Sequence, residues 1–69
     1  MSSARLGSRL KEARLKAGLT QAELADLAGV SRKTVNTVEN GVFVPSTILA
    51  LCLARALNTT VEDLFWLAD

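Results

Sequence analysis

The segment from Thr20 to Gly41 carries the strongest local signals in this sequence and limits the folds that the chain can adopt. Thr20 is followed three residues later by Glu23, the spacing at which two side chains satisfy the free amides of a helix start. A helix over residues 21–28 is therefore predicted. It should end at Gly29, because glycine adopts the left-handed conformation of a helix C-terminus at little cost.

A second helix is predicted after a very short turn. Ser31 is a good N-cap for a helix over residues 32–40, in which Val35 and Val38 share one face at i, i+3 spacing. Val30 should fill the angle between the two helices. The two helices therefore form a tight pair, and the polar residues of the second helix face outward.

At this point the sequence resembles the helix-turn-helix of the phage-repressor family of bacterial and phage regulators, also called the Cro/cI-like or XRE family. The stretches LTQAELA, GVSRKTV and VENG carry the resemblance, which extends from about Leu6 to Phe65. It implies an all-α fold of five short helices, a lambda-repressor-like DNA-binding domain with the helix-turn-helix at helices 2 and 3. It also implies a transcriptional regulator, which we expect to be a repressor that binds a palindromic operator as a homodimer.

Three further helices are predicted around the central pair. Leucine and alanine recur at helical spacing near the start of the chain, with Ser3 as the expected N-cap. Ser46 follows a proline and Thr60 follows a polar turn, and each marks another helix start. The flanking helices should cover about residues 4–16, 47–57 and 61–67. A chain of 69 residues has room for one such domain, over residues 1–69.

Composition supports a compact module in the cytoplasm. Apolar residues make up 49% of the chain and charged residues 22%, which excludes a disordered tail. The longest nearly apolar run, residues 48–54, is too short to span a bilayer, and charged residues interrupt residues 1–16, so no signal peptide is expected. The single Cys52 fits a reducing compartment. We therefore expect a cytoplasmic protein with no membrane contact.

An enzyme is not expected. The sequence has no histidine, and its one cysteine lies in an apolar segment, so it offers no metal-ligand cluster and no nucleophile with a base at workable spacing. We predict no metal, no cofactor and no small-molecule ligand.

The distribution of charge favours a nucleic-acid partner. Residues 1–33 carry seven basic and three acidic side chains, whereas residues 34–69 carry one basic and four acidic side chains. The basic half contains the start of the second paired helix, and the acidic half is suited to face away from phosphate. Double-stranded DNA is therefore the expected partner.

The outward residues of the second paired helix have side chains suited to the major groove. A helix of radius about 5 Å fits that groove, and its first two turns reach the base edges. A basic side chain can donate to guanine O6 and N7, Asn36 can pair with adenine N6 and N7, and the Thr37 methyl can touch a thymine methyl. The expected base-reading residues are Arg32, Lys33, Asn36 and Thr37. A phosphate contact is the alternative for Arg32 or Lys33.

The DNA backbone should be contacted around the start of the first paired helix, where free amides, the helix dipole and the Gln21 side chain meet. The resemblance adds further positions, and the expected phosphate contacts are Thr20, Gln21, Ser31, Thr34 and Asn40. Arg9, Arg14 and Lys16 should add positive potential. In the family, however, a residue matching Arg14 pairs with an acid matching Glu39, so the resemblance assigns Arg14 and Glu39 to a structural ion pair.

The predicted helix over residues 47–57 is apolar on all sides, with Arg55 as its one charged residue. So small a monomer cannot cover such a helix, and we expect a second copy to cover part of it. Ile48 and Cys52 lie on the Arg55 side, where family members commonly carry polar residues, whereas Leu51 is expected in the core. Trp66 and Leu67 lie off the apolar stripe of the last helix, although Trp66 could instead cover its own core. The expected homodimer interface is Ile48, Cys52, Trp66 and Leu67.

The exposed apolar surface also leaves a different function open. The chain could be an antitoxin or a phage or plasmid accessory protein whose main partner is another protein, with DNA binding secondary. A stable dimer in sedimentation would favour the regulator, and a monomer would leave the surface open for that other partner.

Overall fold

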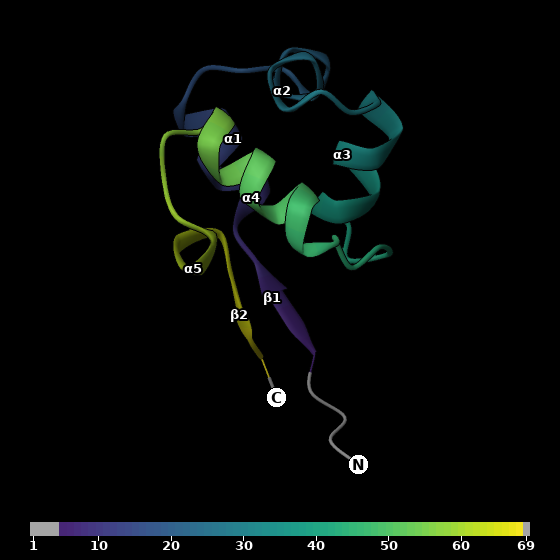
Figure 1. Ribbon diagram of the computed structural model, residues 1–69, viewed down its shortest axis with the longest axis vertical. Helices are drawn as coiled ribbons and strands as arrows, with labels where there is room; N and C mark the ends of the chain where they lie inside the picture. Colours follow the sequence, from purple (N-terminus) through teal and green to yellow (C-terminus); the bar gives the residue numbers. More distant parts are fainter. Residues whose placement is uncertain (1–4, 69) are drawn as a thin grey trace.

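The computed structural model describes residues 5–68, which form a body of five short helices with a two-stranded sheet at one end (Figure 1). The elements are β1 Leu6–Ser8, α1 Leu10–Lys16, α2 Gln21–Ala28, α3 Arg32–Glu39, α4 Thr47–Ala56, α5 Val61–Leu64 and β2 Phe65–Leu67. The predicted five-helix fold with the paired helices at α2 and α3 is confirmed.

Four of the helix starts are fixed by side-chain caps at the predicted positions. The Thr20 hydroxyl accepts from the Glu23 amide at 3.0 Å, and Glu23 Oε1 accepts from the Thr20 amide at 2.8 Å. Ser31, Ser46 and Thr60 cap α3, α4 and α5 in the same way, each accepting from the amide three residues on. Because these caps act locally, they could be recognised from the sequence.

The turn between α2 and α3 depends on Gly29. Its φ of 74° lies in the left-handed region, which a residue with a Cβ adopts only at a cost. The Val30 amide then donates to the Ala25 carbonyl at 2.9 Å, and the Val30 side chain packs against the core. The helices therefore meet at a fixed angle.

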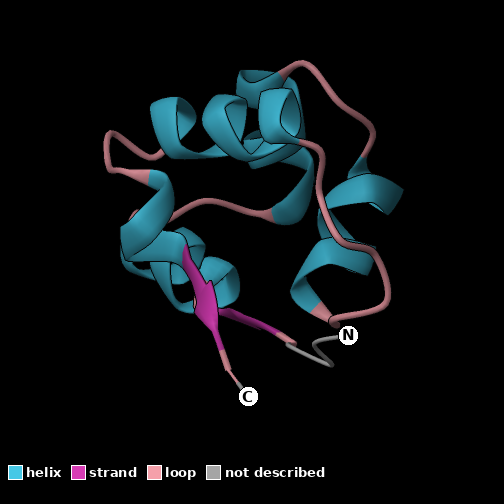
Figure 2. Ribbon diagram, turned by 60° about the horizontal axis from the view of Figure 1, so that its bottom comes forward, coloured by secondary structure: helices cyan, strands magenta, loops and turns pink. Residues whose placement is uncertain are grey.

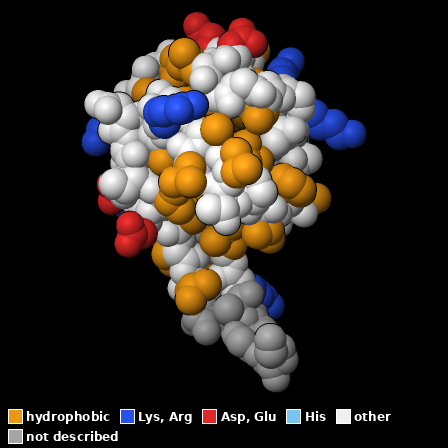
Figure 3. Space-filling model, in the orientation of Figure 1, with side chains coloured by type: hydrophobic (Ala, Val, Ile, Leu, Met, Phe, Trp, Pro, Cys, Tyr) orange, Lys and Arg blue, Asp and Glu red, His pale blue; other side chains and the backbone are white. Residues whose placement is uncertain are grey.

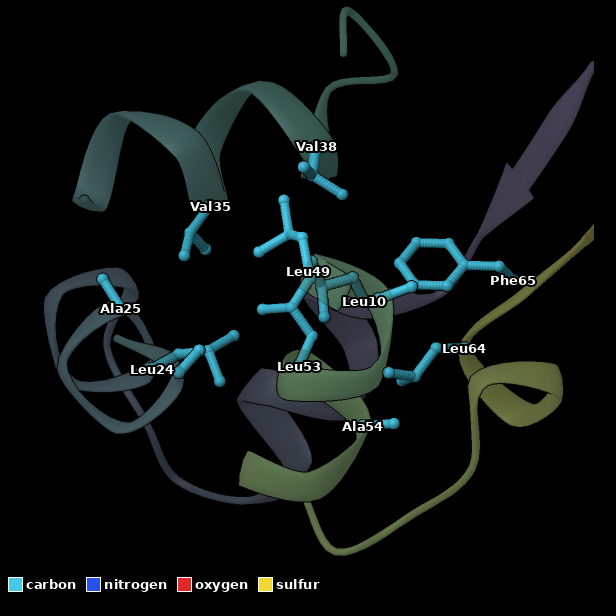
Figure 4. Packing of buried hydrophobic residues seen from close by; sticks show 12 residues of the cluster. Leu10, Leu24, Ala25, Val35, Val38, Leu49, Leu53, Ala54, Leu64 and Phe65 are labelled. Atoms are coloured by element: carbon cyan, nitrogen blue, oxygen red, sulfur yellow. The ribbon is translucent and has the colours of Figure 1, made fainter. Parts of the chain in front are cut away.

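All five helices contribute to one core, and the side chains of Leu10, Leu24, Val35, Leu53 and Leu64 are at most 1% exposed. Figure 4 shows these side chains converging on the space between the helices, with α4 at its centre. Helix α4 packs against both α2 and α5, and α2 packs against α3. The position of α3 relative to the rest of the domain is therefore set by buried apolar contacts.

The prediction of a first helix from residue 4 is wrong at its start. Residues 6–8 form strand β1, and the helix begins at Leu10, whose amide donates to the Ser8 hydroxyl at 3.2 Å. Leu6, one of the leucines that recur at helical spacing near the start of the chain, is 37% exposed. Ser3, the expected cap, lies outside the described residues, as does Ala4. The helical spacing does not extend the helix to residue 4, because Gly7 weakens a helix and β2 provides a strand partner for residues 6–8.

The last helix also differs from its prediction, because it ends at Leu64 and the chain continues as strand β2. Strands β1 and β2 are antiparallel, with Leu6 opposite Leu67, Gly7 opposite Trp66 and Ser8 opposite Phe65 (Figure 2). The alternating directions of strand residues bury Phe65 and leave Trp66 on the other face.

Trp66 packs against its own chain. A Cβ on Gly7 would lie 2.3 Å from Cε2 of the indole, so the ring occupies the space that a side chain at position 7 would need. The Arg9 guanidinium also lies over the ring, 4.8 Å from its centroid, which is a cation–π distance. Trp66 is still 41% exposed.

Helix α4 has one buried face and one exposed apolar face. Leu49, Ala50, Leu53 and Ala54 are buried, whereas Ile48 is 75% exposed and Leu51 is 56% exposed. The expectation that Leu51 belongs to the core is therefore wrong, because it lies one turn before Arg55 on the side that the other helices leave open. Figure 3 shows hydrophobic side chains gathered on the face of the molecule over α4. Within residues 5–68 there is no helix with the length and apolar character needed to cross a membrane.

Candidate nucleic-acid interface

Helix α3 separates its apolar and polar residues onto opposite faces. Val35 and Val38 point into the core, at 0% and 2% exposure (Figure 4). Arg32, Lys33 and Asn36 are exposed. The structure therefore places three of the four predicted base-reading residues on one open surface.

Thr37, the fourth predicted base-reading residue, is only partly exposed. Its hydroxyl donates to the Thr34 carbonyl at 3.0 Å, one turn earlier in α3. That bond turns the oxygen toward the helix backbone.

The start of α2 lies beside the exposed face of α3. One shallow depression is lined by residues of both helices, among them Thr20, Gln21, Ala22 and Arg32. A second one is lined by Gln21, Arg32, Lys33 and Asn36. The first helix start and the polar face of α3 therefore form one continuous surface, because both depressions include Gln21 and Arg32.

Gln21 also makes hydrogen bonds that the sequence did not indicate. Its side-chain NH₂ donates to Asn36 Oδ1 and to Glu39 Oε1, each at 3.1 Å. The NH₂ of Asn40 approaches the same Asn36 oxygen at 3.4 Å. The predicted role of Gln21 and Asn40 is a phosphate contact. The i, i+4 spacing of Asn36 and Asn40 permits a hydrogen bond between their side chains, whereas no spacing within one helix connects Gln21 of α2 to Asn36 of α3.

Arg14 and Glu39 form a buried ion pair, as the resemblance implied. Arg14 Nε donates to Glu39 Oε2 at 2.6 Å and Nη2 donates to Oε1 at 3.2 Å, and the two side chains are 8% and 1% exposed. Arg14 Nη1 also donates to the Leu19 carbonyl at 2.9 Å. The hydrogen bond to Glu39 raises the pKa of Arg14 above its ordinary value, so the guanidinium stays charged although it is buried.

Comparison with known proteins identifies the family. The helix-turn-helix family matches residues 10–64, which include all five helices. The chain belongs to this family. It is a DNA-binding helix-turn-helix regulator of the Cro/cI-like type, as the resemblance predicted, and the family is a class of regulators and not of enzymes.

Relatives match this helix-turn-helix chain over most of its length. It is 40% identical to YgzD of Bacillus subtilis, an uncharacterized HTH-type transcriptional regulator, over 90% of this chain and 94% of the relative. It is 48% identical to an uncharacterized HTH-type transcriptional regulator of Methanothermobacter thermautotrophicus, over 87% of this chain and 88% of the relative. The restriction-modification controller protein C.AhdI of Aeromonas hydrophila has a similar structure, with a TM-score of 0.77 and 40% identity over 80% of this chain and 83% of that protein.

Two of the hydroxyl groups among the predicted phosphate contacts of this helix-turn-helix, those of Thr20 and Ser31, already act as caps. Ser31 Oγ accepts from the Thr34 amide at 3.1 Å and lies 2.8 Å from the Thr34 hydroxyl. Thr20 caps α2, and its own amide donates to Glu23, which lowers the pKa of that carboxyl below its ordinary value. Hydroxyls committed in this way hold the helix starts rigid, which leaves the free backbone amides of the first turn directed outward.

Of the three basic residues expected to add positive potential, Arg14 is paired with Glu39 and Arg9 lies over Trp66. Lys16 is exposed at the end of α1. Among residues 5–68 no three potential metal ligands lie close enough together to hold an ion.

Proposed function

We propose that this protein represses transcription by binding a palindromic operator as a homodimer, with α3 of each copy in the major groove. Arg32, Lys33, Asn36 and Thr37 would read base edges. The observation that carries the proposal is the division of α3 into a buried valine face and an exposed polar face, because a helix must be uncovered on one side to enter the groove.

The phosphate contacts in this proposal come from Thr20, Gln21, Ser31, Thr34 and Asn40. The shallow depression shared by α2 and Arg32 supports this part of the proposal, because it lies at the N-terminus of α2, where the helix dipole favours an anion. These contacts would fix the depth and direction of α3 in the groove but would read no sequence themselves.

The homodimer is proposed from the exposed apolar face of α4. Ile48, Leu51 and Cys52 line a shallow groove that also includes Val61 of α5. Apolar side chains exposed together on a small domain favour association, and a two-fold dimer covers the same patch on both copies. Leu67 is 74% exposed and could join this interface, whereas the Trp66 indole already contacts Gly7 and Arg9 of its own chain.

Repression is the simplest regulatory outcome for such a dimer, because occupancy of an operator is enough to block a promoter. Two of the matched relatives are named transcriptional regulators, and the similar solved structure is named a restriction-modification controller protein. These names favour a regulator over the alternative of an antitoxin or accessory protein. We also propose one domain over residues 1–69 and a cytoplasmic location, where the DNA partner is found.

Selection of bound sequences from a random DNA pool tests the proposal. We expect enrichment of two inverted half-sites whose centres are about 34–36 Å apart, one turn of the duplex. Enrichment of a single half-site would contradict the dimer, and a pool without enrichment would contradict sequence-specific binding.

Sedimentation of the Ile48→Glu variant tests the interface. A charge at this exposed position should shift the protein from dimer to monomer without unfolding it, because Ile48 is outside the core. Leu27→Glu is the matched control, since Leu27 is an exposed apolar residue on α2, at 61% exposure. A dimer that survives Ile48→Glu, or a monomeric unsubstituted protein, would contradict the proposed interface.

A further inference from the structure

The side chain of Asn36 is held in one orientation by a series of contacts that begins at the buried ion pair. Arg14 donates to both carboxylate oxygens of Glu39, so Glu39 acts as an acceptor. Glu39 Oε1 lies 3.1 Å from one terminal atom of the Gln21 amide. Only the NH₂ group of that amide can face a carboxylate, so the orientation of the Gln21 amide is fixed.

Gln21 fixes Asn36 in the same way. The Gln21 NH₂ lies 3.1 Å from the Asn36 amide, so the Asn36 atom that faces it must be the oxygen, because the reverse orientation would bring two NH₂ groups together. Asn40 presents its own NH₂ to the same oxygen at 3.4 Å. The ion pair between α1 and α3 therefore determines which end of the Asn36 amide faces outward.

The consequence is that Asn36 has one kind of hydrogen-bonding group left. A side-chain carbonyl oxygen has two lone pairs, and Gln21 and Asn40 use both. Within residues 5–68 no acceptor takes a hydrogen bond from Asn36 Nδ2, and the residue is exposed beside Arg32 and Lys33. Asn36 thus presents donors, and no free acceptor, to a partner on this surface.

We infer that Asn36 reads DNA as a donor only, and that it selects guanine and rejects adenine at the base pair it faces. Guanine offers two adjacent acceptors in the major groove, O6 and N7, whereas adenine places its N6 amino group, a donor, beside N7. The pairing with adenine expected from the sequence needs the Asn36 oxygen as an acceptor, and that oxygen is occupied. This inference rests on the proposed function, because it needs α3 in the major groove.

Selection of bound sequences by the full chain and by three single variants tests the inference. The unsubstituted protein should select guanine at one position of each half-site, by about tenfold over adenine, and Asn36→Ala should lose the preference at that position alone. Asn36→Asp keeps the shape and the contacts from Gln21 and Asn40 but presents an oxygen in place of the NH₂. It should therefore shift the preference to bases with an exposed amino group, cytosine or adenine.

Asn40→Ala separates the positioning role of Asn40 from a purely structural role or a phosphate contact. Removal of the Asn40 NH₂ frees one lone pair on the Asn36 oxygen, so adenine should become acceptable and the preference for guanine over adenine should fall severalfold at the same position. Loss of a structural or phosphate contact would instead lower affinity for all sequences alike.

Three results would overturn the inference. The first is selection of adenine at the position that responds to Asn36→Ala. The second is that no position responds to Asn36→Ala. The third is that Asn40→Ala leaves the base preference unchanged. If the unsubstituted protein enriched no sequence, the proposed function would fail together with the inference. If it enriched half-sites that ignored Asn36, the inference alone would fail.

Discussion

The guanidinium of Arg14 and the carboxylate of Glu39 are 2.6 Å apart between Nε and Oε2, and this contact joins α1 to the last residue of α3. Both side chains are almost fully buried. The pair therefore links the helix that presents the polar surface to an element that lies outside the helix-turn-helix itself.

Replacement of Glu39 by alanine should lower the free energy of unfolding by about 3 to 5 kcal/mol, because it leaves a buried guanidinium without its partner. Urea denaturation followed by circular dichroism would measure this change. The double variant Arg14→Met, Glu39→Leu removes both charges and should recover most of the loss. If Glu39→Ala were as stable as the unsubstituted protein, the pair would not contribute to the fold.

Replacement of Arg32 by alanine should weaken binding to a cognate operator by about 1 to 3 kcal/mol and relax the base preference at one position. Gln21→Ala is the comparison. Its phosphate contact reads no sequence and its hydrogen bond reaches Asn36, so it should weaken binding without changing the base preference at the position that Arg32 reads. Operator titrations and bound-sequence selection would measure both effects. An unchanged base preference for Arg32→Ala would remove Arg32 from the base-reading residues.

Binding should weaken as salt rises, with a slope of about −0.9 in log K against log salt for each neutralised phosphate. Filter binding over a salt series would give the slope. Lys33→Ala should relax base preference, since we expect Lys33 to read bases. If Lys33→Ala left the base preference unchanged and made the slope of log K against log salt shallower by about one, Lys33 would be assigned to a phosphate contact instead.

Replacement of Gly7 by alanine should force the Trp66 ring away from β1, because the new Cβ would lie 2.3 Å from Cε2 of the indole. We expect a loss of about 1 to 3 kcal/mol in unfolding free energy, typical of overpacking, and a change in tryptophan fluorescence. In a Trp66→Ala background the same substitution should cost much less, and a double-mutant cycle measures the difference. Equal costs in both backgrounds would show that the ring does not oppose a side chain at position 7.

The capping carboxylate of Glu23 should make stability depend on pH in the acid range. Hydrogen bonds from Thr20 lower the pKa of Glu23 in the folded state, so its contribution is present at neutral pH and is lost as pH falls through that lowered pKa. Glu23→Gln keeps the capping geometry without the charge. The unsubstituted protein should therefore melt at a higher temperature than Glu23→Gln near pH 7, and the difference in melting temperature should disappear as pH falls below that lowered pKa. A constant difference across this range would contradict the role of the charge.

The central helices could be predicted because their signals are local. The caps at Thr20 and Ser31 and the turn at Gly29 each act within a few residues, so the sequence alone indicated where α2 and α3 begin and where they are joined. The two ends of the chain could not be predicted in this way. Strand β1 forms because it pairs with Phe65–Leu67. A pattern that spans only a few residues cannot indicate a partner so distant in the sequence.

The candidate site shows the same limit. Exposure of Arg32, Lys33 and Asn36 followed from the spacing of Val35 and Val38 on the opposite face. The hydrogen bonds from Gln21 to Asn36 and Glu39 depend on the angle between two helices, which packing decides. Sequence therefore indicated which side chains face outward but not which of their atoms remain free.

The strand pair has a practical consequence for protein engineering. Ala68 donates its amide to the Arg5 carbonyl at 2.8 Å, so the polypeptide enters and leaves this part of the domain at the same place. A domain with adjacent entry and exit points can be inserted into a surface loop of a host protein without separating the two halves of that loop. The helical body would then project from the host protein. It would be joined to the host at both ends of the domain, whereas an end-to-end fusion joins it at one end.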